Sequence, residues 1–287
     1  MEAYASVPSV KGEKVKKLLV SALILGIAVI AGCAGDDDPA GPGGTLATVQ
    51  NLVVSEASTG NSIVLTWSAV ESVDGYKVYF RETADGNWAE VGTESSTTFT
   101  HTATVAGYYT VRAYKGNDYS EQYANPVNTL PNIVNTIYRI YDNFAPANYD
   151  SGFIFGPNSG QTGKVTDPNF KQDIYAYDES KGDPDVWLYS GDYGQFGNGN
   201  RTYMADPKGD YGCCNPYGSG EWYQSYRLYQ TDKAVFCALP YSSGNVIYVK
   251  MYGLAVSPEP SSQNGTEVAF MYEYQTMENV TVFTSNY

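Results

Sequence analysis

The residue types best suited to binding chemistry are concentrated between Ser190 and Glu221 and in the tryptophan that follows. Glycines separate a series of aromatic residues there: Tyr193, Phe196, Tyr203, Tyr211, Tyr217 and Trp222. Three aspartates lie among them: Asp192, Asp206 and Asp210. Aromatic faces can stack on sugar rings, and carboxylates can accept hydrogen bonds from sugar hydroxyls. This stretch therefore predicts a binding site for a glycan, another polymer or a protein.

Two further interpretations of the same stretch stay open. A loop longer than about 15 residues without structure of its own is usually functional or disordered. Its Gly-Asp pairs could hold Ca²⁺ through oxygen ligands, although no EF-hand spacing is present. The same residues could also be ordinary turn residues around a disulfide.

The sequence lacks the residue patterns of the common enzyme classes. It has no Gly-x-Ser-x-Gly elbow with a histidine, no zinc signature, no phosphate-binding loop and no dinucleotide fingerprint. Carboxylate-pair chemistry remains, as in a glycoside hydrolase, with Asp183, Asp185 and Glu221 as candidate residues. We predict that the protein is not an enzyme, with a glycoside hydrolase as the alternative.

An N-terminal segment, residues 1–33, indicates where the protein works. Basic residues from Lys14 to Lys17 precede an apolar run from Leu18 to Ala31, which is shorter than the roughly 20 apolar residues of a transmembrane helix. The run ends in Ile-Ala-Gly-Cys, which resembles the signal of bacterial lipoproteins. The resemblance implies cleavage before Cys33, a lipid on Cys33 and attachment to a membrane through that lipid.

Residues 34–45 are acidic and rich in glycine and proline, and they predict a flexible tether. Acidic residues directly behind the lipidated cysteine also resemble the surface-export signal of some Gram-negative lipoproteins. We therefore expect an exported protein, anchored to the bacterial outer membrane or the cell surface.

The remaining cysteines are Cys213, Cys214 and Cys237. Because an exported protein meets an oxidising environment, we expect a disulfide between Cys237 and either Cys213 or Cys214. A zinc site is the alternative, but zinc needs three or four ligands and His101 is the only histidine. We predict no metal here.

Composition restricts both the partner and the fold. The formal net charge is −14, and no basic stretch follows the signal, so the protein should repel phosphate backbones and not bind nucleic acid. The sequence contains 27 tyrosines and shows no helical pattern beyond the signal. Both features predict an all-β protein.

Residues 46–130 predict a β-sandwich, because apolar residues alternate in Ile63–Trp67, Tyr76–Arg81 and Tyr109–Tyr114 with turn clusters between them. Three motifs in order, LTWSAV, DGYKVYFR and YTVRAYKGNDYSEQY, resemble a fibronectin type III module. Such modules are mostly spacers and adhesion surfaces, so the resemblance implies a rigid spacer domain between the membrane and the next domain. His101 lies two residues after Phe99, on the same side of the expected strand, and is therefore expected to be a half-buried strand residue.

Residues 131–287 predict a larger antiparallel β domain, a sandwich or jelly roll with about eight strands. The expected strands cover residues 133–141, 152–155, 173–177, 186–189, 222–229, 234–239, 246–254 and 267–274. FIFGPNSGQTG, KQDIYAYDES, VIYVKMYGLAV and VAFMYEYQTMENVTVF, in this order, resemble the HmuY-like β domains of surface lipoproteins. Some relatives hold haem between two histidines. This domain has no histidine, which leaves methionine as the haem ligand type: Met204, Met251, Met271 and Met277.

These observations together predict a non-catalytic surface lipoprotein, in which a spacer domain presents a tyrosine-rich β domain for extracellular binding. Its partners would be the membrane, through the lipid, and a glycan or surface protein. No cofactor is expected. The alternatives are a structural or adhesive subunit that self-assembles into a homo-oligomer, a haem-binding protein and a glycoside hydrolase.

Overall fold

A computed structural model describes residues 46–181, 185–258 and 265–285. The predicted signal peptide, lipidated Cys33 and tether lie outside these residues, as does Asp183. Eighteen antiparallel strands and no helix occur in the described residues, so the predicted all-β class is confirmed. The same residues contain no helix that could span a membrane.

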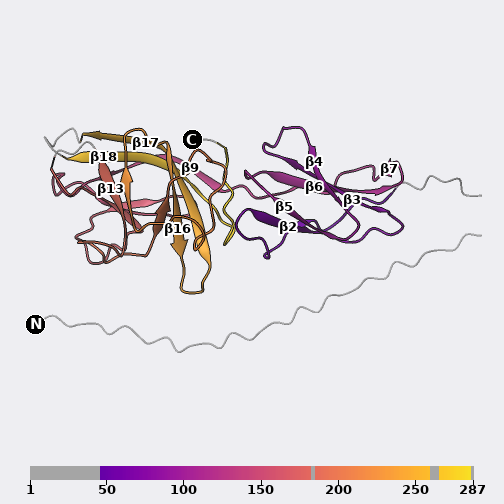
Figure 1. The fold of residues 1–287 in the computed structure, drawn as a ribbon, viewed down its shortest axis with the longest axis horizontal. Helices are drawn as coiled ribbons and strands as arrows, with labels where there is room; N and C mark the ends of the chain where they lie inside the picture. Colours follow the sequence, from indigo (N-terminus) through magenta and orange to yellow (C-terminus); the bar gives the residue numbers. More distant parts are fainter. Residues whose placement is uncertain (1–45, 182–184, 259–264, 286–287) are drawn as a thin grey trace, which may run out of the picture. The chain divides into compact units, whose positions relative to one another are not determined.

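The first sandwich has the strand arrangement expected for a fibronectin type III module (Figure 1). One sheet has the order β1-β2-β5, and the other has the order β4-β3-β6-β7 with β8 paired to β6. The strand bounds are β1 Val53–Val54, β2 Ser62–Thr66, β3 Gly75–Arg81, β4 Ala89–Glu94, β5 Thr98–Thr102, β6 Tyr108–Lys115, β7 Asp118–Tyr119 and β8 Val127–Asn128. Period-two alternation sends Ile63, Leu65 and Val111 into the core between the sheets, where all three are fully buried.

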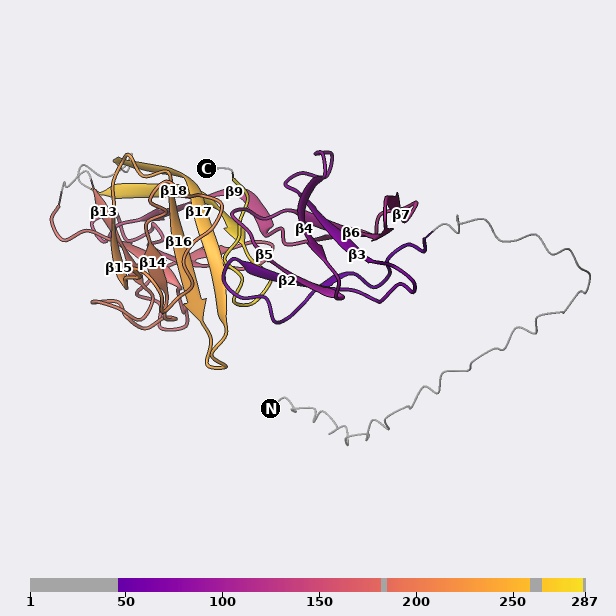
Figure 2. The ribbon, with the colours of Figure 1, turned by 45° about the vertical axis from the view of Figure 1, so that its right-hand side comes forward.

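The second sandwich pairs two five-stranded sheets of different strand length. We call β11-β10-β12-β13-β15 the short-strand sheet and β14-β16-β17-β18-β9 the long-strand sheet. Figure 2 shows β14 beside β16 at the edge of the long-strand sheet. The bounds are β9 Asn132–Tyr141, β10 Gly152–Ile154, β11 Gln161–Gly163, β12 Ile174–Tyr177, β13 Val186–Ser190, β14 Tyr203–Ala205, β15 Ser225–Leu228, β16 Ala234–Pro240, β17 Val246–Pro258 and β18 Thr266–Tyr274.

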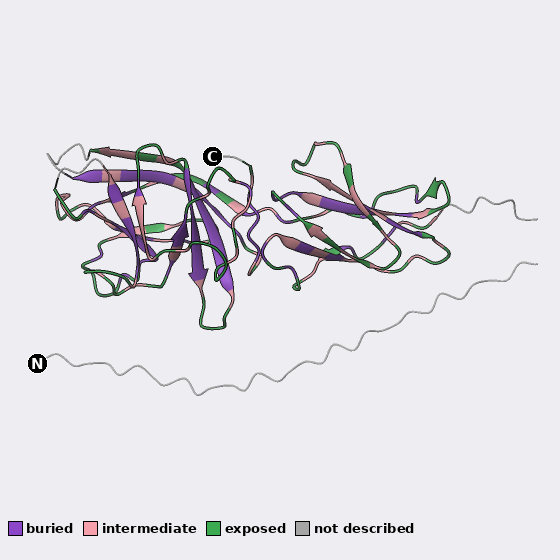
Figure 3. Ribbon diagram, in the orientation of Figure 1, coloured by how far each residue is buried: buried purple, intermediate pink, exposed green. Residues whose placement is uncertain are grey.

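Apolar side chains from both sheets fill the second sandwich. Phe153 and Leu188 of the short-strand sheet and Val249 and Phe270 of the long-strand sheet are all inaccessible to solvent. Figure 3 shows that β17 and β18 are buried along much of their length. Burial of a side chain of this size contributes about 1.5–3 kcal/mol, which makes this core the main support of both outer faces.

The segment after β18 returns to the first sandwich. Thr281 donates a backbone hydrogen bond to Gly60 O at 2.9 Å, and Gly60 donates one to Asn279 O at 2.7 Å. Val280 and Val282 are buried in the core of the first sandwich. The described residues from 46 to 285 accordingly form one compact unit.

A buried ion pair fixes the end of this segment on the long-strand sheet. Lys250 Nζ lies 3.2 Å from Glu273 Oε1, and both side chains are buried. Lys250 also donates to Thr284 O at 2.8 Å, while Thr284 N donates to Glu273 Oε2 at 2.9 Å. Each buried charge thus has an opposite charge and further hydrogen bonds, which buried ions require.

Candidate binding site

Four aromatic side chains form the outer face of the short-strand sheet on β12 and β13. They are Tyr175, Tyr177, Trp187 and Tyr189. The alternate residues of the same strands point into the sandwich core. The register places Tyr175 opposite Tyr189 and Tyr177 opposite Trp187. Facing aromatic pairs of this kind contribute roughly 0.2–1 kcal/mol each, so the sheet and its aromatic face stabilise one another.

The rings contact each other around Tyr189. Tyr177 stacks on Tyr189 with ring centroids 5.0 Å apart and planes at 25°. Tyr175 and Trp187 meet Tyr189 edge-on at 5.5 and 6.2 Å. Tyr177 and Trp187 are half-exposed, so ring surface remains open to solvent. We call these four residues, with Tyr193 and Phe196, the aromatic face.

Tyr193 and Phe196 come from the loop after β13 and extend the surface. Tyr193 packs on Tyr189 at 5.2 Å and is 41% exposed, the most open ring of the set. Phe196 packs edge-on against Tyr175 at 6.0 Å. Tyr175 Oη donates to Tyr193 O at 2.6 Å, and this bond ties the loop to β12. The structure thus joins two sequence-predicted aromatics to four strand aromatics.

Two glycines allow this loop to lie close to the sheet. A Cβ atom on Gly191 would come within 1.8 Å of Gln172 O, and one on Gly199 within 2.1 Å of the same oxygen. Gln172 in turn donates from Nε2 to Phe196 O at 2.9 Å. Any larger residue at either glycine would push the loop outward and move its rings off the sheet.

The carboxylate of Asp192 lies at the edge of the aromatic face and is fixed there by hydrogen bonds. Its oxygens accept hydrogen bonds from Ser190 Oγ at 2.6 Å, Arg201 Nε at 2.6 Å and Gln224 Nε2 at 3.1 Å. Partial burial alone would raise the pKa of Asp192, but these hydrogen bonds and the Arg201 charge hold it below its usual value. Asp192 therefore stays ionised and is paired with a cation.

The hydroxyls of Tyr175 and Tyr189 stay protonated at neutral pH. Burial raises the pKa of Tyr175 to about 12, and burial together with Glu179 raises that of Tyr189 to about 12. Tyr189 Oη donates to Glu179 Oε1 at 3.4 Å. The rings themselves are uncharged, and the carboxylate of Asp192 beside them is paired with Arg201. Such a surface suits neutral, hydroxyl-rich rings.

The other predicted aromatics lie on the opposite outer face, that of the long-strand sheet. Tyr203 packs on Tyr217 at 4.6 Å, and Trp222 lies 6.0 Å from Tyr248. Tyr203 and Trp222 pack against the buried cluster that contains Phe236. The structure therefore divides the predicted set between two faces of the sandwich.

Asp206 and Trp222 line a small cavity of about 150 Å³ on that second face. Lys208 and Glu221 close one side with an exposed ion pair at 2.7 Å. Tyr211 contributes its backbone carbonyl, which accepts a hydrogen bond from Lys250 at 3.2 Å. These contacts attach loop 206–222 to the long-strand sheet, and the aromatic face remains the candidate site.

The three described cysteines are free, and the predicted bridge from Cys237 to Cys213 or Cys214 is absent. The bridge is absent because the side chains of these cysteines lie on different sides of the long-strand sheet or in different cores. Cys237 points into the core of the second sandwich, with its Sγ 3.8 Å from Met251 Sδ, whereas Cys214 packs on the outer face of the same sheet. Cys213 packs against the core of the first sandwich.

The candidate haem and metal ligands lie apart from the aromatic face. Met204 and Met251 are fully buried in the sandwich core. His101 faces Tyr109, with Nδ1 2.9 Å from Tyr109 Oη, and burial lowers its pKa. Within the described ranges, no group of three or more His, Cys, Asp or Glu side chains could hold a metal ion.

The candidate carboxylates for glycoside hydrolysis have separate partners. Asp185 accepts from Arg227 Nη2 at 3.3 Å beside the aromatic face. Glu221 pairs with Lys208 on the opposite face, where this exposed pair lowers the pKa of Glu221. The two carboxylates therefore belong to different surfaces.

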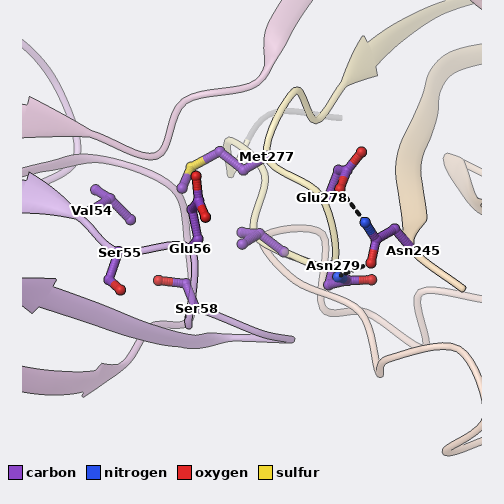
Figure 4. Close-up of a pocket in the computed structure, with 9 residues that line it drawn as sticks. Val54, Ser55, Glu56, Ser58, Asn245, Met277, Glu278 and Asn279 are labelled. Carbon is purple, nitrogen blue, oxygen red and sulfur yellow. Dashed lines mark hydrogen bonds between the residues drawn. The ribbon is translucent and has the colours of Figure 1, made fainter. Parts of the chain in front are cut away.

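A larger cleft of about 500 Å³ lies where the C-terminal segment meets the first sandwich (Figure 4). Asn245 donates to Glu278, and Asn279 Nδ2 donates to Asn245 Oδ1 at 3.2 Å. Asn279 Oδ1 also accepts from Val246 N at 3.0 Å. These polar groups hold the C-terminal segment in place.

The sequence interpretation missed the four strand aromatics of the aromatic face. Their signal was present in Ile-Tyr-Ala-Tyr and Val-Trp-Leu-Tyr, where each second residue is aromatic. Two adjacent strands with this alternation must place all four rings on one face if they pair in register. The pairing of β12 with β13 brings them together, and the alternation within each strand does not show which strands are neighbours.

No family model matches the sequence, and no curated protein matches it. Among solved structures, a crystal structure of an Fn3-like protein from Clostridium thermocellum is 24% identical, with a TM-score of 0.27; the match covers 30% of this chain and 92% of that one. Titin kinase with its flanking domains is 12% identical at a TM-score of 0.27, with 79% and 37% covered. The twitchin kinase region from C. elegans is 11% identical at 0.28, with 80% and 40% covered.

Proposed function

We propose that this protein is a non-catalytic, lipid-anchored extracellular binding protein that holds a polysaccharide on its aromatic face. The observation that supports the proposal is the partly exposed rings of Tyr177, Trp187, Tyr193 and Phe196, which pack over the buried rings of Tyr175 and Tyr189 on the outside of the second sandwich. The lipoprotein signal at Cys33 supports an exported, membrane-attached location. The fibronectin type III-like sandwich would then separate the binding domain from the membrane.

The chemistry of the face favours neutral sugar rings. Its rings carry no charge, and the adjacent Asp192 is already paired with Arg201 at 2.6 Å. Sugar rings present apolar C–H faces to aromatic rings and hydroxyls to neutral tyrosine oxygens. Because strand aromatics are held in place by their neighbours, binding requires little ordering of side chains.

Affinity electrophoresis of the full-length protein against a panel of soluble neutral glucans, mannans and xylans tests this proposal. We expect retention by at least one polymer, and Tyr193→Ala and Trp187→Ala should weaken it by about 1–3 kcal/mol. Tyr241→Ala is the matched control, since Tyr241 is 48% exposed and lies between β16 and β17. The retention of the Tyr241→Ala variant should equal that of the unmodified protein.

Three results would contradict the proposal. One is the absence of retention by every polymer of the panel. Another is equal retention of all variants, which would show that the rings do not contact the ligand. The third is a loss confined to Trp222→Ala or Tyr203→Ala, which would move binding to the opposite face.

A further inference from the structure

A second surface that combines cations with aromatic rings lies on the first sandwich, away from the aromatic face. It is the outer face of the sheet β4-β3-β6-β7, where alternation directs the polar residues of β3 and β6 to solvent. We call it the cationic face, and its members are Lys77, Tyr79, Arg81, Trp88, Arg112, Tyr119 and Tyr123.

The cations of this face lie over aromatic rings. The guanidinium carbon of Arg81 is 4.1 Å from the ring centroid of Trp88. That of Arg112 is 4.9 Å from the Tyr123 ring and 5.2 Å from the Tyr119 ring. Trp88 and Tyr123 stack on each other at 6.1 Å, so the two arginine sites belong to one layer. Stacking of this kind holds a guanidinium in a fixed plane before any ligand arrives.

The guanidinium groups keep hydrogen-bonding capacity for a ligand. Arg81 donates from Nη1 to Gly86 O at 3.3 Å, and Arg112 donates from Nε and Nη2 to Ser120 O. A guanidinium has five N–H donors, so these contacts use only part of each group. Both arginines are half-exposed.

The charge of this face is opposite to that of its surroundings. Residues 46–130 contain nine acidic but only four basic residues. Three of the four basic residues, Lys77, Arg81 and Arg112, lie on the cationic face. Glu90, on the adjacent strand, is bound to Lys77 at 2.8 Å. A ligand with negative charges would thus be attracted to this face and repelled by the rest of the sandwich.

The spacing of the cations favours a ligand with charge along its length. Lys77 of β3 is in register with Arg112 of β6, and Arg81 follows four residues later on β3. Four residues of a strand cover roughly 13 Å. A small anion could therefore contact one end of the face only, whereas an extended polymer with repeated charges could contact both.

We propose that the cationic face binds an acidic polysaccharide, one that carries carboxylate or sulfate groups. Planar guanidinium groups match the two oxygens of such groups. Tyr119 and Tyr123, each 38% exposed, offer ring surface on which sugar rings stack. An acidic peptide would supply charge without rings for these tyrosines. This site is independent of the aromatic face and of the neutral ligand proposed there.

Binding of the full-length protein, purified in detergent, to polygalacturonate tests the proposal. Methyl-esterified polygalacturonate keeps the sugar rings but lacks the charge, and polyglutamate keeps the charge but lacks the rings. We expect the affinity for polygalacturonate to fall with added salt. Both comparison polymers should bind at least about tenfold more weakly than polygalacturonate does. Equal binding of the methyl ester, stronger binding of polyglutamate or no binding of polygalacturonate would overturn the proposal.

Matched variants connect the binding to this face. Arg81→Gln should reduce the affinity for polygalacturonate at least tenfold, because a charge-assisted bond is lost. Lys115→Gln makes the same change in net charge at the exposed end of β6 and should bind like the unmodified protein. Arg81→Lys keeps the charge but loses the planar fork, and it should fall between the two. Equal losses of affinity for Arg81→Gln and Lys115→Gln would overturn the proposal. An unchanged affinity of Arg81→Gln would also overturn it. If Arg81→Gln does not fold, an unchanged affinity of Arg81→Lys would have the same meaning.

Discussion

Asp173 connects the loop of the aromatic face to the core of the second sandwich. Its Oδ2 accepts from Phe155 N at 2.7 Å, and its Oδ1 accepts from Asn200 Nδ2 at 2.9 Å. The side chain is almost fully buried. Burial raises the pKa of Asp173 to about 6, although the hydrogen bonds from Asn200 and Phe155 act in the opposite direction.

This raised pKa predicts a pH-dependent stability. Asp173 binds its proton more tightly in the folded than in the unfolded protein, so its contribution is greatest below pH 4 and declines as the pH rises to about 6. The difference corresponds to on the order of 3 kcal/mol. Urea denaturation at pH 4, 5.5 and 7 should show a smaller loss of stability for Asp173→Asn than for the unmodified protein. Glu71→Gln, which removes an exposed carboxylate, should behave like the unmodified protein, and parallel curves for all three would refute the prediction.

At the residue scale, the sequence predicted part of the candidate site. Tyr193, Phe196 and Asp192 were selected because aromatic and acidic residues between glycines indicate a loop that can bind. Tyr203 and Trp222 satisfied the same criterion, but they pack on the opposite face. Composition identifies which residues could bind, whereas only strand pairing determines which of them share a surface.

At the scale of elements, most strands were predictable, but two very short ones were not. All eight strands expected between residues 131 and 287 are present. β11 and β14 have three residues each and were not predicted, because Gln-Thr-Gly is all polar and Tyr-Met-Ala is all apolar, and neither shows alternation. β10 is equally short, but it continues into an apolar run that ends at Phe155 and was predicted. β14 lies between Ser190 and Glu221, where the composition predicts a loop, and it pairs with Cys237 and its neighbours on β16.

The return of the C-terminal segment to the first sandwich was also not predictable. The isolated bridge between Gly60 and Val280 joins residues that are far apart in the sequence. Residues 280–283 alternate too briefly to indicate a strand, and they follow a Met-Glu-Asn turn sequence. Contacts of this range depend on the relative placement of whole sheets, about which local patterns carry no information.

This segment should contribute to the stability of the first sandwich. Val280 is 1% exposed in the core of the first sandwich, so Val280→Ala leaves a cavity and should cost about 2 kcal/mol. Hydrogen exchange at the amides of β2 and β6 should become faster in this variant. Val53→Ala is the control, because Val53 is 49% exposed on β1. Unchanged exchange in Val280→Ala would show that the first sandwich is stable without the C-terminal segment.

At the scale of the whole molecule, two proposed ligand surfaces lie on a body that carries a strong negative charge. The aromatic face is neutral, and the cationic face is locally positive, so each differs in chemistry from the acidic remainder. The proposed lipid anchor on Cys33, near the N-terminus, would keep both surfaces outside the cell. Location is therefore part of the proposed function and can be tested separately from binding.

Cys33→Ser should release the protein from the membrane. In the proposed signal, the thiol of Cys33 takes the lipid, and a hydroxyl at this position cannot replace it. The signal segment before residue 33 would then stay attached, so the variant should be longer by mass spectrometry. It should also leave the detergent phase in a phase-partition assay. Cys213→Ser is the matched control, since Cys213 is a free thiol in the folded body and should have no part in anchoring. A Cys33→Ser protein that is still cut and membrane-bound would exclude the lipoprotein proposal while leaving both ligand surfaces open to test.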